Sequence, residues 1–328
     1  MTSPRVSVLS KALSAGSRSY VVCAAGASAA VLCALAAPTL PYSTSAVRWL
    51  VELGGHWVWP ATAMTLLTAW RGRGWVRGMS AAAACTGIVA LALAHSPVSA
   101  GAPDAPRLRI ASSNVFIGNK DASKLLLPWI AERKPDVLMV QEVSPAMAAE
   151  LEKLADYPHR MVVGRVDGFG IALLSKHPLA NVHLIPGEGD TPAIGATMTW
   201  QGKEVELVAA HPLPPITAPL YARRNHRLAQ LADGLAQSGK PAIIAGDFNA
   251  TPWSSGVKVV EERGLRRATS LVPTWPAQLG PLALIPIDQV MVSKQWDVVA
   301  RQRGPNVGSD HFPVEVDLSL AVPNAASR

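Results

Sequence analysis

The distribution of charge constrains this chain most, because it divides the sequence into two parts of different kinds. Residues 1–103 contain seven of the 30 Lys and Arg residues but only one of the 23 Asp and Glu residues. The formal net charge of the whole chain, +7, therefore belongs almost entirely to its first third. The remaining part is close to neutral, which argues against a high-affinity nucleic-acid surface on it.

Three stretches of the first part are long and almost free of charge. Residues 19–47 and 78–103 hold no charged side chain, and residues 49–70 hold only Glu52. Each is about 20 residues or longer, which is the length needed to cross a hydrocarbon core of roughly 30 Å. We therefore expect three transmembrane helices within residues 1–100. Three buried helices of a soluble domain are the alternative, and one Ala-rich stretch could instead lie at the membrane interface.

The positions of the basic residues predict how these helices are oriented. The amino-terminal tail carries Arg5, Lys11 and Arg18, and the link between the second and third stretches reads RGRGWVRG. Cytoplasmic loops carry the excess of Lys and Arg, so both segments are predicted to be cytoplasmic. With three crossings, the chain after about residue 100 lies outside the cytoplasm. A cleavable signal is the alternative, because PVSA at 97–100 resembles a small-residue cleavage site.

The second part is predicted to be one separate domain. Residues 101–106 form a Pro/Gly/Ala linker, the domain spans residues 107–320, and residues 321–328 form a tail. All three cysteines precede the linker. The domain therefore has no disulfide, no catalytic cysteine and no zinc–thiolate site.

The pattern of apolar runs indicates the class of this domain. RLRIASSNV, DVLMVQEV and AIIAGDFN read as strands separated by helical stretches. Four other runs follow one another as strands: HRMVVGR, GIALLSK, AIGATMTW and KEVELVAAHP. Strands that alternate with helices in some places and run consecutively in others favour two packed sheets with helices outside, rather than one parallel sheet.

Polar residues recur where apolar runs end or begin. AIIAGDFN ends in Asp247 and Asn249, which would leave the same face of a strand because side chains alternate along it. An Asx-type turn would explain this pair alone. The same pattern, however, places Asn114, Glu142, His211, Asp288, Asp310 and His311 at other strand ends. Loops at strand ends are where rigid scaffolds carry catalytic residues, and a set of carboxylates, amides and imidazoles favours Mg²⁺ or Mn²⁺ and phosphate over zinc.

Seven short motifs occur in a fixed order along the domain. They are SNV at 113–115, QE at 141–142, ALLSKHP at 172–178, AAHP at 209–212, GDFN at 246–249, IDQVMVS at 287–293 and SDHFPV at 309–314. Together they resemble the endonuclease/exonuclease/phosphatase superfamily, and GDFN with SDHFPV is the most specific combination. The resemblance implies a four-layer α/β sandwich, with two packed mixed sheets flanked by helices and the active site at the top of both sheets.

The resemblance also implies catalytic roles for five side chains. Asp247 would orient and deprotonate the attacking water, and Asn249 would hold the phosphoryl oxygens. His311, positioned by Asp288, would stabilise the transition state or act as an acid. His211 would contact the phosphate from the other side. In-line attack on phosphorus builds charge on its oxygens, and fixed donors beside a metal ion stabilise that charge.

A metal site is the second consequence of the resemblance. Glu142 would bind Mg²⁺ or Mn²⁺, with Asn114 beside it and Asp310 contributing. Phe116 stands where apurinic-site endonucleases of the family carry an acid, which argues against a second metal ion. Gln289 stands where a histidine is common, and no loss of catalysis is expected from it.

The site predicts a phosphohydrolase but does not name its ester. Three membrane spans followed by this domain resemble the VanJ-type bacterial membrane proteins linked to teicoplanin-class glycopeptide resistance, which implies dephosphorylation of undecaprenyl pyrophosphate. The apolar, proline-rich segments 212–221 and 272–286 flank catalytic positions and would suit a mouth that meets lipid; ordinary loop packing is the alternative. Arg223 and Arg227 are candidates to bind the pyrophosphate, against a simple solvated helix face.

We thus expect a multi-pass protein of the cell membrane whose catalytic domain is extracytoplasmic. Its expected partner is a membrane lipid or lipid-linked pyrophosphate; no specific nucleic acid is expected, and the sequence indicates no protein partner. A surface-tethered nuclease or a phospholipid phosphodiesterase would use the same metal chemistry. A non-catalytic membrane scaffold is the alternative of a different class.

Overall fold

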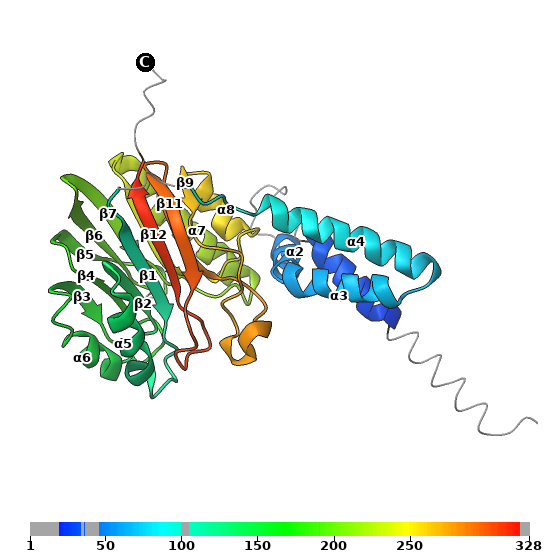
Figure 1. Cartoon of the computed structure of the whole chain (residues 1–328), viewed down its shortest axis with the longest axis horizontal. Coiled ribbons are helices and arrows are strands. Elements are labelled where there is room, and N and C mark those ends of the chain that lie inside the picture. The colour runs from blue at the N-terminus through cyan, green and yellow to red at the C-terminus, as the bar shows by residue number, and fades with distance from the viewer. Residues whose placement is uncertain (1–19, 34–35, 37–45, 100–104, 190, 322–328) are drawn as a thin grey trace, which may run out of the picture. The chain divides into compact units, whose positions relative to one another are not determined.

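The computed structural model describes residues 20–33, 36, 46–99, 105–189 and 191–321 (Figure 1). The chain divides into two compact units, Met1–Ala94 and His95–Arg328. Most of the predicted linker and the predicted tail lie outside the described residues. The two units are considered in turn.

The first unit is helical. Its described helices are Tyr20–Cys33, α2 (Ala46–Gly55), α3 (Val58–Arg71) and α4 (Gly74–Leu93). In the described part of the unit, only α4 has the length and composition of a membrane-crossing helix, and Tyr20–Cys33 is apolar but shorter. Three transmembrane helices are therefore not confirmed.

The second predicted span is two helices in the structure rather than one. Residues 49–70 are divided between α2 and α3, and the division follows the pair Gly54 and Gly55. Glycine lowers helix stability by roughly 1 kcal/mol relative to alanine, so two in succession favour an interruption. The third predicted span is α4, which begins at Gly74 and ends at Leu93 rather than covering residues 78–103.

The second unit contains two six-stranded mixed sheets, as predicted. The first sheet has the order β11-β12-β1-β2-β4-β3 and the second the order β5-β6-β7-β8-β10-β9. β1 is parallel to β2 and β7 is parallel to β8, whereas the other neighbouring pairs are antiparallel. The strands are β1 (Leu108–Asn114), β2 (Val137–Gln141), β3 (His159–Val163), β4 (Ile171–Ser175), β5 (Leu179–Ile185), β6 (Ala193–Trp200), β7 (Lys203–Ala209), β8 (Ala242–Asp247), β9 (Leu265–Arg267), β10 (Asp288–Ser293), β11 (Trp296–Arg303) and β12 (Val314–Leu320).

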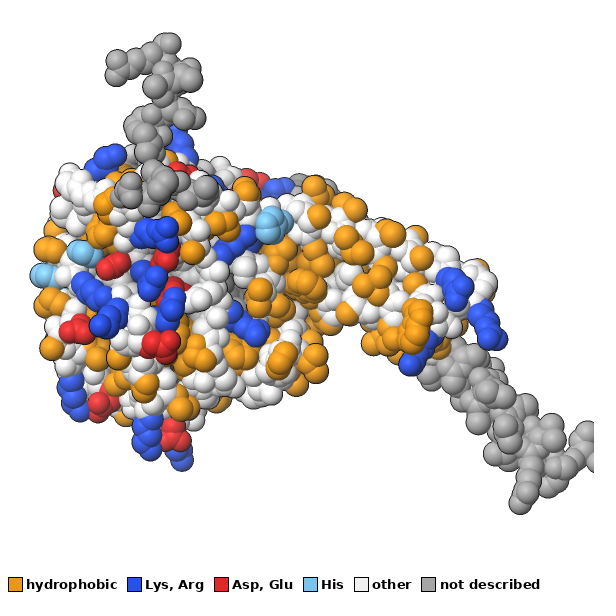
Figure 2. Space-filling view, viewed as in Figure 1, with side chains coloured by type: hydrophobic (Ala, Val, Ile, Leu, Met, Phe, Trp, Pro, Cys, Tyr) orange, Lys and Arg blue, Asp and Glu red, His pale blue; other side chains and the backbone are white. Residues whose placement is uncertain are grey.

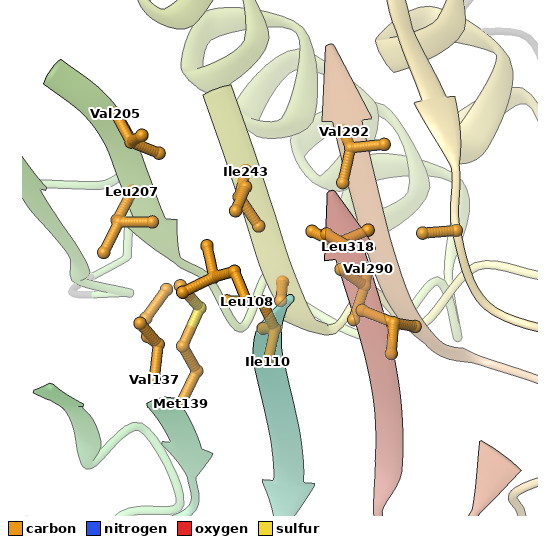
Figure 3. Packing of buried hydrophobic residues seen from close by; sticks show 14 of the residues in the cluster. Leu108, Ile110, Val137, Met139, Val205, Leu207, Ile243, Val290, Val292 and Leu318 are labelled. Carbon is orange, nitrogen blue, oxygen red and sulfur yellow. The ribbon is translucent and has the colours of Figure 1, made fainter. Parts of the chain in front are cut away.

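Apolar side chains hold the two sheets face to face. Leu108 and Ile110 on β1 point into this core, and the residue next along the strand, Ala111, packs on the opposite face (Figure 3). This alternation follows from the two-residue period of a strand. The second sheet contributes side chains such as Ile243 and Val290, both fully buried.

Helices cover the outer face of each sheet. Helices α5 (Ala122–Arg133) and α6 (Pro145–Leu151) pack through Leu126 and Met147 on the first sheet. Helices α7 (Ala218–Ser238) and α8 (Ser255–Glu261) pack through Leu228 and Val257 on the second. The short helix η1 (Ala277–Leu282) lies in the loop before β10. The unit therefore has the layers helix, sheet, sheet and helix.

The segment that follows α4 is bonded to the second unit. Ser99 N donates to Val298 O of β11 at 2.8 Å, and Arg301 Nη2 donates to Ser96 O at 2.6 Å. Arg267 Nη2 donates to Ser96 Oγ at 3.2 Å. Residues 95–99 are thus part of the second unit rather than a free tether.

The strand ends that carry the polar motifs meet at one edge of the sandwich. Asn114 at the end of β1 pairs with Gln141 at the end of the parallel strand β2. In the second sheet, Asp247 at the end of β8 is directly opposite Asp288 at the start of the antiparallel strand β10. The topology therefore brings residues from distant parts of the sequence to one place.

Candidate active site

An amide and two carboxylates connect the two sheets. Asn114 Nδ2 donates to Glu142 Oε1 at 2.9 Å and to Asp247 Oδ2 at 3.1 Å. Asn114 and Asp247 are buried, and they come from β1 of one sheet and β8 of the other. This amide fixes the spacing of two acids that would otherwise repel each other.

The backbone turns Glu142 toward the site. Its φ of 58° lies in the left-handed region, which non-glycine residues seldom adopt. Glu142 Oε2 accepts a hydrogen bond from Ile117 N at 2.8 Å, and Phe116 N donates to Asn114 Oδ1 at 3.0 Å. The loop after β1 therefore holds both side chains, and such a backbone conformation is typical of functional positions.

Two imidazoles face one oxygen of Asp247. His211 Nε2 and His311 Nε2 each lie 3.6 Å from Asp247 Oδ2. His311 Nδ1 is 2.9 Å from Asp288 Oδ2. The carboxylate therefore orients the imidazole ring, and Nδ1 carries the proton that Asp288 accepts. Both rings are more than nine-tenths buried.

These contacts set the charge states of the cluster. Burial disfavours the charged imidazole, but Asp288 and Asp247 outweigh it and raise the pKa of His311 to about 10. Burial also lowers the pKa of His211, but Asp247 more than compensates, so the pKa of His211 is raised. Burial works against ionisation of Asp247 as well, yet His311 and His211 lower the pKa of that carboxyl to about 2. For Asp288, burial is the dominant effect and raises the pKa.

Asn249 is fixed through its backbone and its side chain. Its φ is 49°, and its N–H donates to Asp247 Oδ1 at 2.8 Å, which is the Asx-type turn that the sequence allowed. Asn249 Nδ2 donates to Pro212 O at 3.1 Å. The turn and the functional arrangement are therefore compatible, because the second oxygen of Asp247 still faces the imidazoles.

Arg224 supports this site through Asn249, a role that was not predicted from the sequence. It is fully buried on α7 and donates from Nη1 to Asn249 O at 2.7 Å. Its Nε and Nη2 both donate to Asn225 Oδ1, at 2.9 and 2.7 Å. Helical spacing could have revealed it, because Tyr221, Arg224 and Leu228 lie three and four residues apart on one face, and Tyr221 and Leu228 are fully buried.

The two arginines predicted to bind pyrophosphate have other contacts. Arg227 is buried and donates to the backbone oxygens of Pro186 and Ile185 at 2.9 and 2.6 Å, a structural role that leaves it little capacity for a ligand. Arg223 Nε lies 3.4 Å from Glu188 Oε2, and Arg223 and Arg227 both line a cavity of about 130 Å³. Their binding of phosphate stays a prediction.

Asp310 lies beside the cluster but turns toward a loop. Trp275 Nε1 donates to Asp310 Oδ2 at 3.2 Å, and Ala277 N donates to Asp310 O at 2.7 Å. Ser309 Oγ donates to Asn114 O at 2.7 Å, which ties this segment to β1. A direct role of Asp310 in metal binding also stays a prediction.

The cluster has the composition that a hard divalent cation requires. Glu142, Asp247, Asp288 and Asp310 converge, and within the described residues none of them pairs with Lys or Arg. Asp247, Asp288 and His311 offer ligand atoms within 4.8 Å of one another, although the bond between Asp288 and His311 occupies two of those atoms. Each oxygen of Glu142 accepts one hydrogen bond and keeps a second lone pair, so Glu142, with Asn114 beside it, can still hold Mg²⁺ or Mn²⁺.

The sequence profile of the Endonuclease/Exonuclease/phosphatase family matches residues 111–311. The chain belongs to this family. The match begins within β1 and ends at His311, so it includes every residue of the cluster described above.

A curated relative and several solved structures agree with this assignment. The chain is 27% identical to the DNA repair nuclease APEX1 of Danio rerio over 225 residues, which cover 62% of this chain and 71% of the relative. A humanized D. rerio TDP2 structure superposes with a TM-score of 0.56 at 19% identity, covering 65% of this chain and 99% of that one. The structure of the human Nocturnin catalytic domain with bound sulfate superposes with a TM-score of 0.53 at 20% identity, covering 66% of this chain and 94% of that one. At these identities the solved structures establish the fold.

Proposed function

We propose that this protein is a divalent-metal-dependent phosphohydrolase of the cell membrane that removes phosphate from a lipid pyrophosphate, with polyprenyl pyrophosphate as its preferred substrate. The observation that carries the chemistry is the convergence of Asn114, Glu142, Asp247 and His311 at the edge shared by both sheets. The observation that favours a membrane substrate is α4, which has the length and composition to cross a bilayer.

Asp247 prepares the nucleophile in this proposal. Its carboxylate is ionised at neutral pH because the pKa is near 2, so it can accept a hydrogen bond from an attacking water. The same low pKa makes it a weak base until the transition state develops. Its main contribution is therefore to hold and aim the water.

The imidazoles and the amide act on the phosphoryl oxygens. His311 is protonated at neutral pH, because the pKa near 10 keeps its charge, and it places a cation where negative charge develops. His211 approaches Asp247 from the loop after β7, and Asn249 supplies an amide held by Pro212. Mg²⁺ or Mn²⁺ held by Glu142 and Asn114 would polarise a phosphoryl oxygen.

The wider setting of the proposal follows from the sequence. The excess of basic residues in the amino-terminal tail and in residues 71–78 supports an extracytoplasmic catalytic unit with three spans. An enzyme placed there would return the wall-lipid carrier to use, which would connect it with teicoplanin-class resistance.

One assay tests the function. Full-length protein in detergent is supplied with undecaprenyl pyrophosphate, a phospholipid or plasmid DNA, with Mg²⁺ or with EDTA. We expect phosphate release from the pyrophosphate in Mg²⁺ alone, and a loss of at least about 10³-fold in Asp247→Asn and Glu142→Gln. Release that persists in both variants would refute the assigned site.

A nuclease is the second candidate, and the similarity to the nuclease APEX1 favours it. Plasmid nicking in Mg²⁺ without turnover of the lipid would establish it in place of the first. Phospholipid cleavage alone would indicate a phosphodiesterase. A non-catalytic scaffold would turn over none of the three, nor bis-p-nitrophenyl phosphate.

A further inference from the structure

Large apolar side chains are exposed on three loops beside the active site. Phe116 is 39% exposed, Ile216 66%, Leu279 46% and Leu282 74%. These four side chains are called the apolar rim below. Large exposed apolar groups on several neighbouring loops indicate an interaction surface.

Each of the three loops is bonded to a residue of the site. Phe116 N donates to Asn114 Oδ1, and Asn249 Nδ2 donates to Pro212 O in the loop that carries Ile216. The loop of η1, which carries Leu279 and Leu282, is held at Asp310 through Ala277 N at 2.7 Å. The three loops that carry the apolar rim therefore lie beside the catalytic cluster, because the residues to which they are bonded lie together.

The η1 loop is also packed in place. Ala277 and Ala283 form a small buried cluster with Phe312, the residue after His311. Arg303 stacks on the ring of Phe312 at 4.1 Å and donates from Nη1 to Pro273 O at 2.7 Å. In Figure 2, hydrophobic side chains gather over this loop, which is light orange in Figure 1. The loop that carries the two exposed leucines is therefore held in place by packing and hydrogen bonding.

The charge of these loops decides which partner they suit. Residues 211–222 and 268–287 contain no Asp, Glu, Lys or Arg, and the loop of Phe116 carries one charge of each sign, Lys120 and Asp121. A nucleic acid is bound mainly through several Lys and Arg contacts to its phosphates, and these loops offer only Lys120. A lipid surface is instead met by apolar groups that enter the boundary between headgroups and acyl chains.

We infer that the apolar rim inserts into the surface of a lipid bilayer around the mouth of the active site, so that the site receives its phosphate directly from a membrane-embedded ester. This inference rests on the proposed function and specifies how the active site reaches its substrate. The candidate membrane helix α4 ends at Leu93, three residues before Ser96, which is bonded to the catalytic unit. A bilayer is therefore the apolar surface that this chain meets.

The test maps contact with lipid without using catalysis. Full-length protein is reconstituted into phosphatidylcholine vesicles that contain a phospholipid with a photoreactive diazirine near the start of its acyl chain. After illumination, we expect lipid adducts on tryptic peptides 204–223 and 268–294, which contain Ile216 and the two leucines. Ile216→Asp and Leu279→Asp should each reduce the adduct on its own peptide at least about fivefold, because a charge is costly to bury in apolar surroundings.

Leu184→Asp is the matched control. Leu184 is 44% exposed, close to the value for Leu279, but it lies on the edge strand β5, separated from β8 by β6 and β7. This variant should leave both adducts unchanged. Adducts that are equal in all variants, or absent from both peptides in the unaltered protein, would overturn the inference. Loss of both adducts when the density of protein in the vesicles is raised would overturn it in favour of a self-association surface.

A kinetic measurement separates docking from catalysis. Ile216→Asp and Leu279→Asp should raise the apparent KM for the lipid pyrophosphate in vesicles about tenfold or more, while hydrolysis of soluble bis-p-nitrophenyl phosphate changes less than about twofold. Equal losses on both substrates would mean that the rim only supports the site, which would contradict the inference. If the unaltered protein gives the adducts but does not hydrolyse the lipid, docking stands and the proposed function fails.

Discussion

His311 and Asp288 form the contact on which the charge of the site depends most. Asp288 and Asp247 together raise the pKa of His311 to about 10, so the imidazole is charged below that pH and loses its charge as the pH rises through it. Asp288→Asn removes one of these two carboxylates. We expect the pKa of His311 to fall and the alkaline limit of activity to move to lower pH, with kcat reduced about 10²-fold or more.

The pH dependence of kcat on bis-p-nitrophenyl phosphate measures this shift. His177→Gln is a useful control, because His177 is only 3.5 Å from a carboxylate, Asp136, but belongs to a different part of the domain. It should leave the profile unchanged. An alkaline limit that stays in place in Asp288→Asn would show that His311 is not the titrating group.

Arg224 acts on the site through Asn249. Its guanidinium is fully buried and bonded to Asn249 O and Asn225 Oδ1, so Arg224→Lys keeps a positive charge but loses the fork that reaches both oxygens. Leaving a buried acceptor unpaired costs about 1–3 kcal/mol. We expect a lower thermal midpoint and a kcat reduced about tenfold, with KM nearly unchanged.

A double substitution tests whether this effect passes through Asn249. Residues that act as one unit are not additive, so Arg224→Lys should reduce kcat little further in an Asn249→Ala background. Losses that simply multiply would indicate that Arg224 serves the stability of α7 alone.

Among the elements, the segment before β1 is bound to the edge of the first sheet. Arg301 donates to Ser96 O and, from Nη1, to Thr269 O at 3.1 Å; Thr269 Oγ1 in turn donates to Gln289 Oε1 at 2.8 Å, next to Asp288. Arg301→Gln should release residues 95–99. Hydrogen exchange of the amide of Ser99, which donates to Val298 O, should become about tenfold faster.

The control for this change is Lys153→Gln, which also removes one positive charge. Within the part of the chain that the structure describes, Lys153 pairs only with Glu150 on the exposed side of α6, and surface ion pairs contribute about 0–1 kcal/mol. Its exchange at Ser99 should match that of the unaltered protein. The same rate in Arg301→Gln would mean that the backbone bond to β11 alone holds the segment.

The elements also show what sequence patterns can and cannot predict. The strand ending at Asp247 was predictable because its residues form a continuous apolar run, and the structure buries all of them. β5 was missed because it is an edge strand whose residues are mostly exposed, so no apolar pattern distinguishes it. β9 has three residues, too few to show a period. The site residues were found through their motifs, but Arg224 was not assigned because its role depends on which face of α7 is buried.

For the whole molecule, the converging acids predict how a metal ion affects stability. A cation that binds only the folded state stabilises it by an amount that rises with the ratio of its concentration to its Kd, about 2.7 kcal/mol at a hundredfold excess. We therefore expect Mg²⁺ to raise the thermal midpoint of full-length protein in detergent, and EDTA to abolish the rise.

Glu142→Gln separates a specific site from a general effect of salt. The amide oxygen can still accept the hydrogen bond from Ile117 N, but the amide NH2 then faces Asn114 Nδ2, which is also a donor. The substitution also removes one of the acids that gather without a Lys or Arg partner among the described residues. The midpoint in EDTA should therefore change little, because one lost hydrogen bond is set against reduced repulsion with Asp247, and the variant should gain little from Mg²⁺. Glu150→Gln, on the exposed side of α6, should retain the full response to Mg²⁺. A midpoint that Mg²⁺ raises equally in both variants would place the stabilising cation elsewhere, and the acids at the sheet edge would then have to be offset by the two imidazoles alone.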